Sequence, residues 1–215
     1  MTINDFDAIY CLHLAESENR VPSFKSQFEK VGIWDKVQIW WTCKRDISNK
    51  VGNFLIEMHT SEYDRLIREC NMTTLYGGVF NCTFEHYTMI KTSYLRGFNH
   101  IMIFEDDITF DGDKEWFEQV LNKIPNDYDI CKFHYTGDSD VSIPSFDQDI
   151  FKKELCHGST MAFCMNRNGM KAYLDAVNEK YWCADMVFLR CKVNNFYTNK
   201  FKICKPNYNF GTEIR

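Results

Sequence analysis

The chain has 215 residues, 45% of them hydrophobic, and 30 acidic against 25 basic residues give it a formal net charge of −5. A chain of this length can bury one sizeable core and falls within the usual range for one α/β domain, so we expect a single domain over residues 1–215. Acidic residues are in excess and no long block of Lys or Arg is present, so we expect no nucleic-acid partner.

Cysteine usage points to a reducing compartment. The ten cysteines are scattered and form no Cys-x-x-Cys pair. Cys11, Cys131 and Cys164 stand among apolar residues typical of strands, where a free thiol behaves as a small hydrophobe. The N-terminus lacks the pattern of a secretory signal, and no run approaches the roughly 18 apolar residues of a membrane span. We therefore expect a soluble, cytoplasmic protein with no transmembrane segment, which leaves room for a peripheral membrane contact.

Apolar periodicity predicts strands that alternate with helices along most of the chain. In chain order we expect strands at 8–14, 37–41, 100–104, 129–135 and 160–165, and helices at 21–31, 81–97, 113–123, 168–177 and 184–192. Alternation of this kind implies an α/β fold with a largely parallel sheet.

Individual residues and local composition predict where two helices end and where two loops lie. Gly32 and Gly97 are expected to end the first two helices, and Asn81 to cap the second. The polar stretch 43–76 predicts a variable loop region with a short helix inside it. Residues 137–153 are rich in Ser, Asp and Pro without a clear period, which predicts a loop.

Three consecutive acids, Glu105-Asp106-Asp107, directly follow the predicted strand that ends at Phe104. Ligands of open α/β sheets bind at the carboxyl ends of strands. If the backbone stays extended, Glu105 and Asp107 point to one side and Asp106 to the other. Carboxylates held close together raise each other's pKa unless a cation neutralises them, and oxygen ligands select Mg²⁺ or Mn²⁺. The alternative is an acidic strand end in solvent.

Further segments stand around this triplet in a particular order: Gly78-Val-Phe-Asn81-Cys82-Thr-Phe-Glu85-His86, then Gly97, then Ile101-Met-Ile-Phe-Glu-Asp-Asp107. The order resembles glycosyltransferase family 25, whose members include bacterial lipooligosaccharide galactosyltransferases and collagen hydroxylysine galactosyltransferases. Three other segments agree: the opening strand followed by Arg20, His157-Gly-Ser-Thr160 before Asn166-Arg-Asn-Gly169, and Asp185 at the start of a late helix. The resemblance covers most of residues 8–191.

The resemblance implies a GT-A-like, Rossmann-like fold, a nucleotide-sugar donor that is most often UDP-galactose, and a Mn²⁺ ion, or Mg²⁺, held by the acidic motif. The implied acceptor is a glycan or lipooligosaccharide hydroxyl, with inversion at the transferred sugar. Carried over to this sequence, the metal ligands are Glu105 and Asp107, with His157 as the late histidine available for a third position. The donor and acceptor contacts are Arg20, His86, Asp106 and Ser159, and the general base is Asp185.

Several of these residues have plain structural alternatives. Arg20 could be a solvated arginine at a helix start, His86 a structural histidine, and Asp185 a helix N-cap. Asn81 and Glu85 also depart from the family pattern near the expected donor pocket.

Cys183, where a Pro is usual, departs from the family pattern as well, but it is the departures at Asn81 and Glu85 that leave the donor sugar open. Two other functions remain open. One is a different metal-dependent enzyme acting on a diphosphate, although the sequence lacks the Gly-rich phosphate loop or basic cluster this would need. The other is a non-catalytic sugar- or nucleotide-binding module of the same fold.

Overall fold

The computed structural model describes the chain except for residues 43–75, 136, 138–139, 156–157, 180–182 and 211–215. The strands are β1 (Ala8–Leu14), β2 (Val37–Thr42), β3 (His100–Glu105), β4 (Ile108–Phe110), β5 (Ile130–Lys132), β6 (Phe151–Lys153), β7 (Ala162–Asn166), β8 (Phe196–Asn199) and β9 (Cys204–Pro206). The helices are α1 (Val21–Lys30), α4 (Tyr76–Leu95), α5 (Lys114–Asn122), α6 (Arg167–Glu179) and α7 (Ala184–Val187). Short 3-10 helices include η2 (Ala15–Arg20) and η4 (Phe188–Arg190).

The described strands form a main sheet of seven, in the order β2-β1-β3-β7-β5-β8-β6, and a separate pair, β4-β9. In the main sheet β1 is parallel to β2 and β3, and β5 is parallel to β8. Only β7 and β6 are reversed, each antiparallel to its neighbours. Five of these seven strands therefore share one direction, which confirms the predicted α/β class with a mostly parallel sheet.

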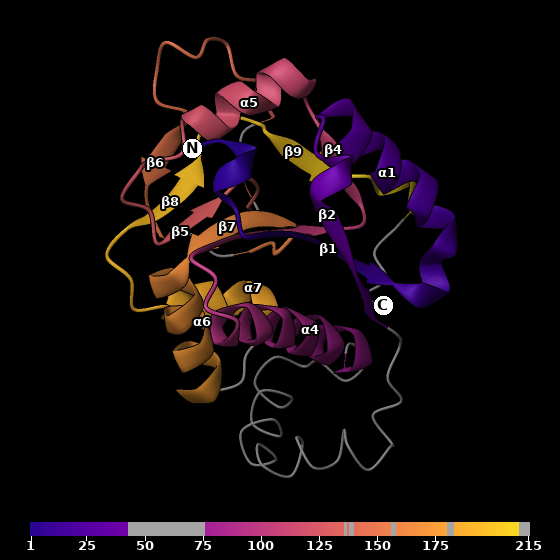
Figure 1. Ribbon diagram of the computed structural model, residues 1–215, viewed down its shortest axis with the longest axis vertical. Helices are drawn as coiled ribbons and strands as arrows, with labels where there is room; N and C mark the ends of the chain where they lie inside the picture. The colour runs from indigo at the N-terminus through magenta and orange to yellow at the C-terminus, as the bar shows by residue number, and fades with distance from the viewer. Residues whose placement is uncertain (43–75, 136, 138–139, 156–157, 180–182, 211–215) are drawn as a thin grey trace.

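Side chains of successive strand residues enter two different cores. Met102 and Phe104 of β3 belong to the core that α1 and α5 cover, whereas Ile101 and Ile103 belong to the core under α4 and α6. Figure 1 shows this layering, with α4, α6 and α7 on one face of the sheet and α1 and α5 on the other. Burial of apolar surface on both faces explains why the central strands read as continuous apolar runs.

Three helix ends follow the local signals of the sequence. Gly32 and Gly97 have φ of 70° and 82°, the left-handed conformation that favours glycine after a helix. Asp113 caps α5, and its side chain accepts a hydrogen bond from the backbone nitrogen of Trp116 at 3.0 Å.

The start of α4 corrects the sequence prediction. The helix begins at Tyr76, so Asn81 lies inside it instead of capping it, and the helix runs through Gly77 and Gly78. A glycine in a helix costs only about 1 kcal/mol relative to alanine, a preference that the rest of the fold can override. The predicted loop at 137–153 also contains a strand, β6, at the edge of the sheet. A three-residue strand is too short to leave a period in the sequence.

The helix expected at 184–192 is divided into the short α-helix α7 and the 3-10 helix η4 that follows it. The short helix expected within 43–76 lies outside the described residues. Within the part that is described, no helix combines the length and the apolar character needed to cross a membrane.

Candidate active site

Several chain segments meet at one edge of the main sheet because of the strand directions. The parallel strands β1 and β3 end there together, with Leu12 opposite Glu105. The reversed strand β7 begins at the same edge, and the backbone nitrogen of Glu105 donates to the carbonyl oxygen of Met161 at 2.8 Å. β5, which runs with β3, ends there as well and is followed by His134. Carboxyl ends of strands are the usual place for a ligand site.

The backbone does not stay extended after Glu105. It turns at Asp106 and Asp107, because the next three residues leave the main sheet and pair as β4 with β9. The three acidic side chains therefore have different surroundings. We call residues 105–107 the acidic turn.

Asp106 is buried and bound on both oxygens. His13 Nδ1 lies 2.6 Å from its Oδ2, and the Nη1 of Arg20 donates to its Oδ1 at 2.7 Å. Arg20 is only 5% exposed, so it is not the solvated arginine considered above. Charge-assisted hydrogen bonds of this length fix the orientation of the carboxylate.

Glu105 and Asp107 are the two acids whose ionisation is disfavoured. Burial raises the pKa of Glu105 to about 7, against a hydrogen bond from Thr160 and with the charges of Asp106 and Asp185 adding to the rise. Burial also raises the pKa of Asp107 to about 7, reinforced by the charges of Glu105 and Asp106. Both carboxyl groups are partly buried, and the charge of Glu105 opposes the ionisation of Asp107, so a divalent cation bound beside them would lower the free energy.

Asp107 also carries an orphaned atom. Its Oδ1 is buried and has no hydrogen-bond partner in the described structure. Buried polar atoms are nearly always bonded, so an exception calls for an explanation. Carboxylate oxygens are hard ligands, and this donor set fits Mg²⁺ or Mn²⁺.

His86 lies beside the acidic turn and is fully buried. Its Nδ1 is 2.8 Å from the carbonyl oxygen of Cys82, which can only accept, so Nδ1 carries the proton. Its Nε2 is 3.6 Å from Oε1 of Glu105 and has no hydrogen-bond partner. Burial lowers the pKa of His86, which favours the neutral ring.

Ser159 has an uncommon backbone conformation at the same edge. Its φ is 61°, although it is not a glycine, and its Oγ lies 2.7 Å from Nδ1 of His134. The preceding carbonyl oxygen, of Gly158, accepts a hydrogen bond from the buried ammonium group of Lys132. Residues held in such conformations concentrate at functional sites.

Asp185 is the second residue of α7, and the N-cap of that helix is Cys183, so the N-cap interpretation of Asp185 is wrong. Its negative charge contributes to the raised pKa of Glu105 and of Cys82. The late helix therefore brings a carboxylate towards the acidic turn. His157 lies outside the described residues.

Sequence reasoning missed three residues of this edge: His13, Lys132 and His134. Each is one polar residue at or just beyond the end of an apolar strand, a pattern that a solvent-exposed strand end also shows. In the structure, the parallel pairing of β1 with β3 puts His13 level with the residue after Glu105, a register that the sequence does not reveal.

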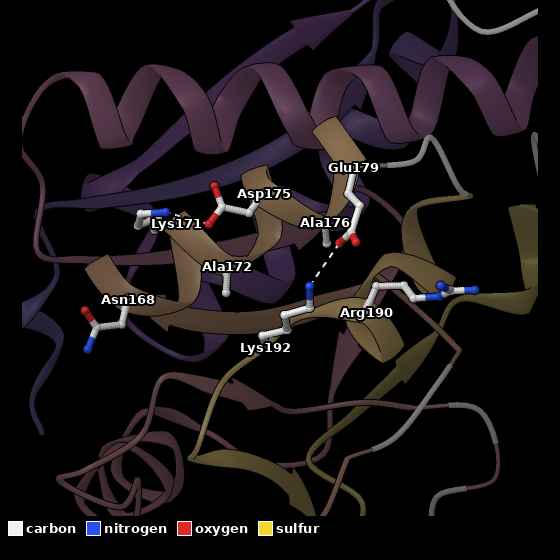
Figure 2. A pocket seen from close by; sticks show the side chains of 8 residues that line it. All are labelled: Asn168, Lys171, Ala172, Asp175, Ala176, Glu179, Arg190 and Lys192. Atoms are coloured by element: carbon white, nitrogen blue, oxygen red, sulfur yellow. Dashed lines mark hydrogen bonds and ion pairs between the residues drawn. The ribbon is translucent and has the colours of Figure 1, made fainter.

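A cavity of about 340 Å³ lies elsewhere, along one side of α6 (Figure 2). Figure 2 shows that its charged side chains are largely paired with one another: Lys171 with Asp175 at 2.5 Å and Lys192 with Glu179 at 3.3 Å. None of the predicted site residues lines it. The acidic turn remains the better candidate for chemistry.

Searches of the sequence against protein-family models and curated proteins find no match. Among solved structures, the chain is similar to A197 from STIV, at 10% identity and a TM-score of 0.46, over 92% of this chain and 83% of that one. It is also similar to a glycosyltransferase involved in the glycosylation of the major capsid of PBCV-1, at 10% identity and a TM-score of 0.46, over 96% and 95%.

A third similar structure is mouse xyloside xylosyltransferase 1 in its apo form, at 11% identity and a TM-score of 0.36, over 86% of this chain and 80% of that one. Two of these three proteins are glycosyltransferases. Likenesses at this level assign neither a family nor an activity to the chain, so its function has to be inferred from the site itself.

Proposed function

We propose that this chain is a metal-dependent glycosyltransferase that moves a sugar from a UDP-sugar to a hydroxyl group of a glycan or lipooligosaccharide. The observation that carries the proposal is the acidic turn. Glu105 and Asp107 are two desolvated carboxyl groups, each with a pKa raised to about 7, at the edge where the parallel strands end. Such a pair suits a cation that accompanies a diphosphate.

Glu105 and Asp107 would hold Mn²⁺ or Mg²⁺, and we keep His157 as the proposed third ligand. The unpartnered Oδ1 of Asp107 supports this ligand set. Bound there, the ion would neutralise the negative charge that grows on the departing nucleoside diphosphate.

The chain's own residues divide the remaining tasks. We assign Arg20 and Asp106 to the donor side. They act as one unit, because their ion pair fixes the acidic turn. His86 faces Glu105 and orients that carboxyl group, and Ser159 lies on the acceptor side. Asp185 is the proposed general base.

In the transfer step, Asp185 would accept the proton of the acceptor hydroxyl. The hydroxyl oxygen forms the new bond to the anomeric carbon from the face opposite the nucleotide, and the bond to the nucleoside diphosphate breaks. The configuration at that carbon is inverted.

The order of the sequence motifs supports membership of family 25, which makes UDP-galactose the first donor to test. We propose the cytoplasm as the compartment. All seven cysteines in the described residues are free. Cys131 and Cys164 stay unbonded although they pair directly across β5 and β7, as expected under reducing conditions.

Calorimetric titration of UDP into the purified chain, with and without Mn²⁺, tests the donor site. We expect Mn²⁺-dependent binding that weakens at least about 10-fold in Asp107→Asn, because one of two proposed carboxylate ligands is lost. Asp175→Asn, which changes an exposed carboxylate on α6, serves as the matched control and is expected to bind like the wild type. Binding that is equal with and without Mn²⁺, or absent in all three proteins, would contradict the assignment of a UDP-sugar donor to the acidic turn.

A further inference from the structure

Cys82, His86 and Glu105 form a cluster whose donor atoms differ in kind from those of the acidic turn. One sulfur, one ring nitrogen and one carboxylate oxygen all lie within 4.8 Å of one another. Cys82 and His86 are four residues apart on α4 and therefore share one face of the helix. Glu105 reaches the cluster from the end of β3, so the three donors come from two elements that the core holds in place.

Nδ1 of His86 makes the backbone hydrogen bond usual for a metal-ligating histidine, and the sulfur of Cys82 lies 3.6 Å from the same nitrogen. This Nδ1 donates to the carbonyl oxygen of Cys82 at 2.8 Å, which fixes the tautomer and leaves a lone pair on Nε2. That Nε2 is fully buried, has no hydrogen-bond partner in the described structure and lies 3.6 Å from Oε1 of Glu105. An unpartnered acceptor in this place points towards a ligand.

Glu105 is supported from the other side. The hydroxyl of Thr160 donates to its Oε1 at 2.5 Å and also lies 3.9 Å from the sulfur of Cys82. Metal-binding carboxylates are commonly held by such outer hydrogen bonds. The cluster thus has both its inner donors and their supporting partners.

We propose that Cys82, His86 and Glu105 bind a transition-metal ion of the zinc class, with one coordination position open to water or a substrate oxygen. A thiolate and an imidazole select Zn²⁺ over Mg²⁺ or Mn²⁺. Zinc–ligand bonds of about 2.0–2.3 Å place tetrahedral donors roughly 3.3–3.7 Å apart, so the separation of Nε2 from Oε1 already suits the ion. On binding, Cys82 releases its thiol proton to solvent.

This site goes beyond the proposed transferase function and does not depend on it. It shares Glu105 with the acidic turn, but Asp107 is not among its ligands. The two sites can therefore be separated by mutation, since Asp107 belongs to one and Cys82 to the other.

The test uses Co²⁺ as a spectroscopic substitute for Zn²⁺ in the chelator-treated full chain. We expect one equivalent of Co²⁺ to give the visible bands of a tetrahedral site and a thiolate-to-cobalt charge-transfer band, both removed by added Zn²⁺. In Cys82→Ser the charge-transfer band should disappear and Zn²⁺ affinity should fall at least about 100-fold. Loss of a residue that only supports a metal ligand can already lower metal affinity by about 100-fold, and Cys82 is proposed as a ligand itself. Cys191→Ser, at a buried thiol bonded to the carbonyl oxygen of Val187, is the matched control and should keep the band.

His86→Gln is a second variant, checked for folding by far-ultraviolet circular dichroism, and should also lose Zn²⁺ affinity. Asp107→Asn should keep the cobalt bands even though its Mn²⁺-dependent UDP binding weakens. A wild-type spectrum without a thiolate band, or a band that survives in Cys82→Ser, would overturn the zinc site. Failure of UDP binding with intact cobalt bands would overturn only the transferase proposal.

Discussion

Three neighbouring carboxyl groups in the acidic turn are held in three different ways. Asp106 is buried between two cationic or hydrogen-bonding partners, Glu105 accepts from a hydroxyl, and Asp107 keeps an oxygen without a partner. A side chain's surroundings, rather than its residue type, therefore set its chemistry. The two hydrogen bonds of Asp106 fix its orientation, and its two neighbours are the groups that we propose as cation ligands.

Arg20→Ala should destabilise the folded chain by about 3 kcal/mol, because breaking a buried pair leaves an uncompensated charge. Urea denaturation measures the change in the free energy of unfolding. The double variant with Asp106→Asn should recover part of the loss, since the orphaned charge is then gone. The exposed pair of Lys171 with Asp175 is the contrast, and Lys171→Ala should change stability little despite the short distance of 2.5 Å. Equal effects at the two pairs would contradict the burial of Arg20.

Stability of the metal-free protein should depend on pH through Asp107. Its pKa rises from 3.8 to about 7 on folding, so between these values the folded chain binds more protons than the unfolded chain. The free energy of unfolding therefore falls as pH rises through this window. Asp107→Asn should melt above the wild type at about pH 8, and the difference should vanish towards about pH 4.

Thermal unfolding in the presence of a chelator checks this pH dependence. Glu105→Gln should show the same sign, because the pKa of Glu105 rises from 4.5 to about 7. Added Mn²⁺ should reverse the order of wild type and variant at the higher pH, since only the charged carboxylates bind the ion tightly. Parallel pH profiles for wild type and Asp107→Asn would count against a desolvated carboxylate.

At the scale of elements, two glycines are required for two distinct structural reasons. Gly97 ends α4 in a left-handed conformation, with open space where a side chain would lie. Gly169 is different: it lies in α6, and a Cβ there would stand 2.1 Å from the carbonyl oxygen of Asp129. Close approach of α6 to the sheet, not backbone freedom, requires that glycine.

The two glycines should respond differently to alanine. Gly169→Ala should cost about 3 kcal/mol, because the backbone of α6 has to move away from Asp129. Gly97→Ala should cost about 1 kcal/mol, the penalty for a left-handed L-residue without a clash. Urea denaturation of both variants compares them directly. A smaller loss for Gly169→Ala than for Gly97→Ala would contradict the tight packing of α6.

At the scale of the whole molecule, the sequence was enough for the elements with long apolar runs and for the position of the acidic turn. β1, β3, α1 and α5 each lie close to their predicted bounds, because periodicity and caps act locally. β4, β8 and β9 were not predicted, since three or four residues carry no period.

The site residues that were not predicted from the sequence were missed for a related reason. His13, Lys132 and His134 become neighbours of the acidic turn only through the register of strands that are distant in sequence. Sequence reasoning can place a polar residue at a strand end, but it cannot tell which strand ends meet. The resemblance in motif order adds a prediction of another kind, because it names Asp185 as a partner of the acids without any knowledge of the register.

The β4–β9 pair has a consequence for the order in which the site is built. The hydroxyl of Thr109 donates a hydrogen bond to the carbonyl oxygen of Lys205, 96 residues later in the sequence. The backbone nitrogen of Asn207 donates to the carbonyl oxygen of Asp107 at 2.5 Å. A growing chain that has reached residue 200 on the ribosome already contains every proposed ligand, yet it lacks the pairing that closes the turn. Contacts between residues this far apart in sequence have a high loop-closure entropy cost and form late in folding. Cation binding at Asp107 should therefore begin only after residues 204–207 have been synthesised, and it should indicate that the chain has folded.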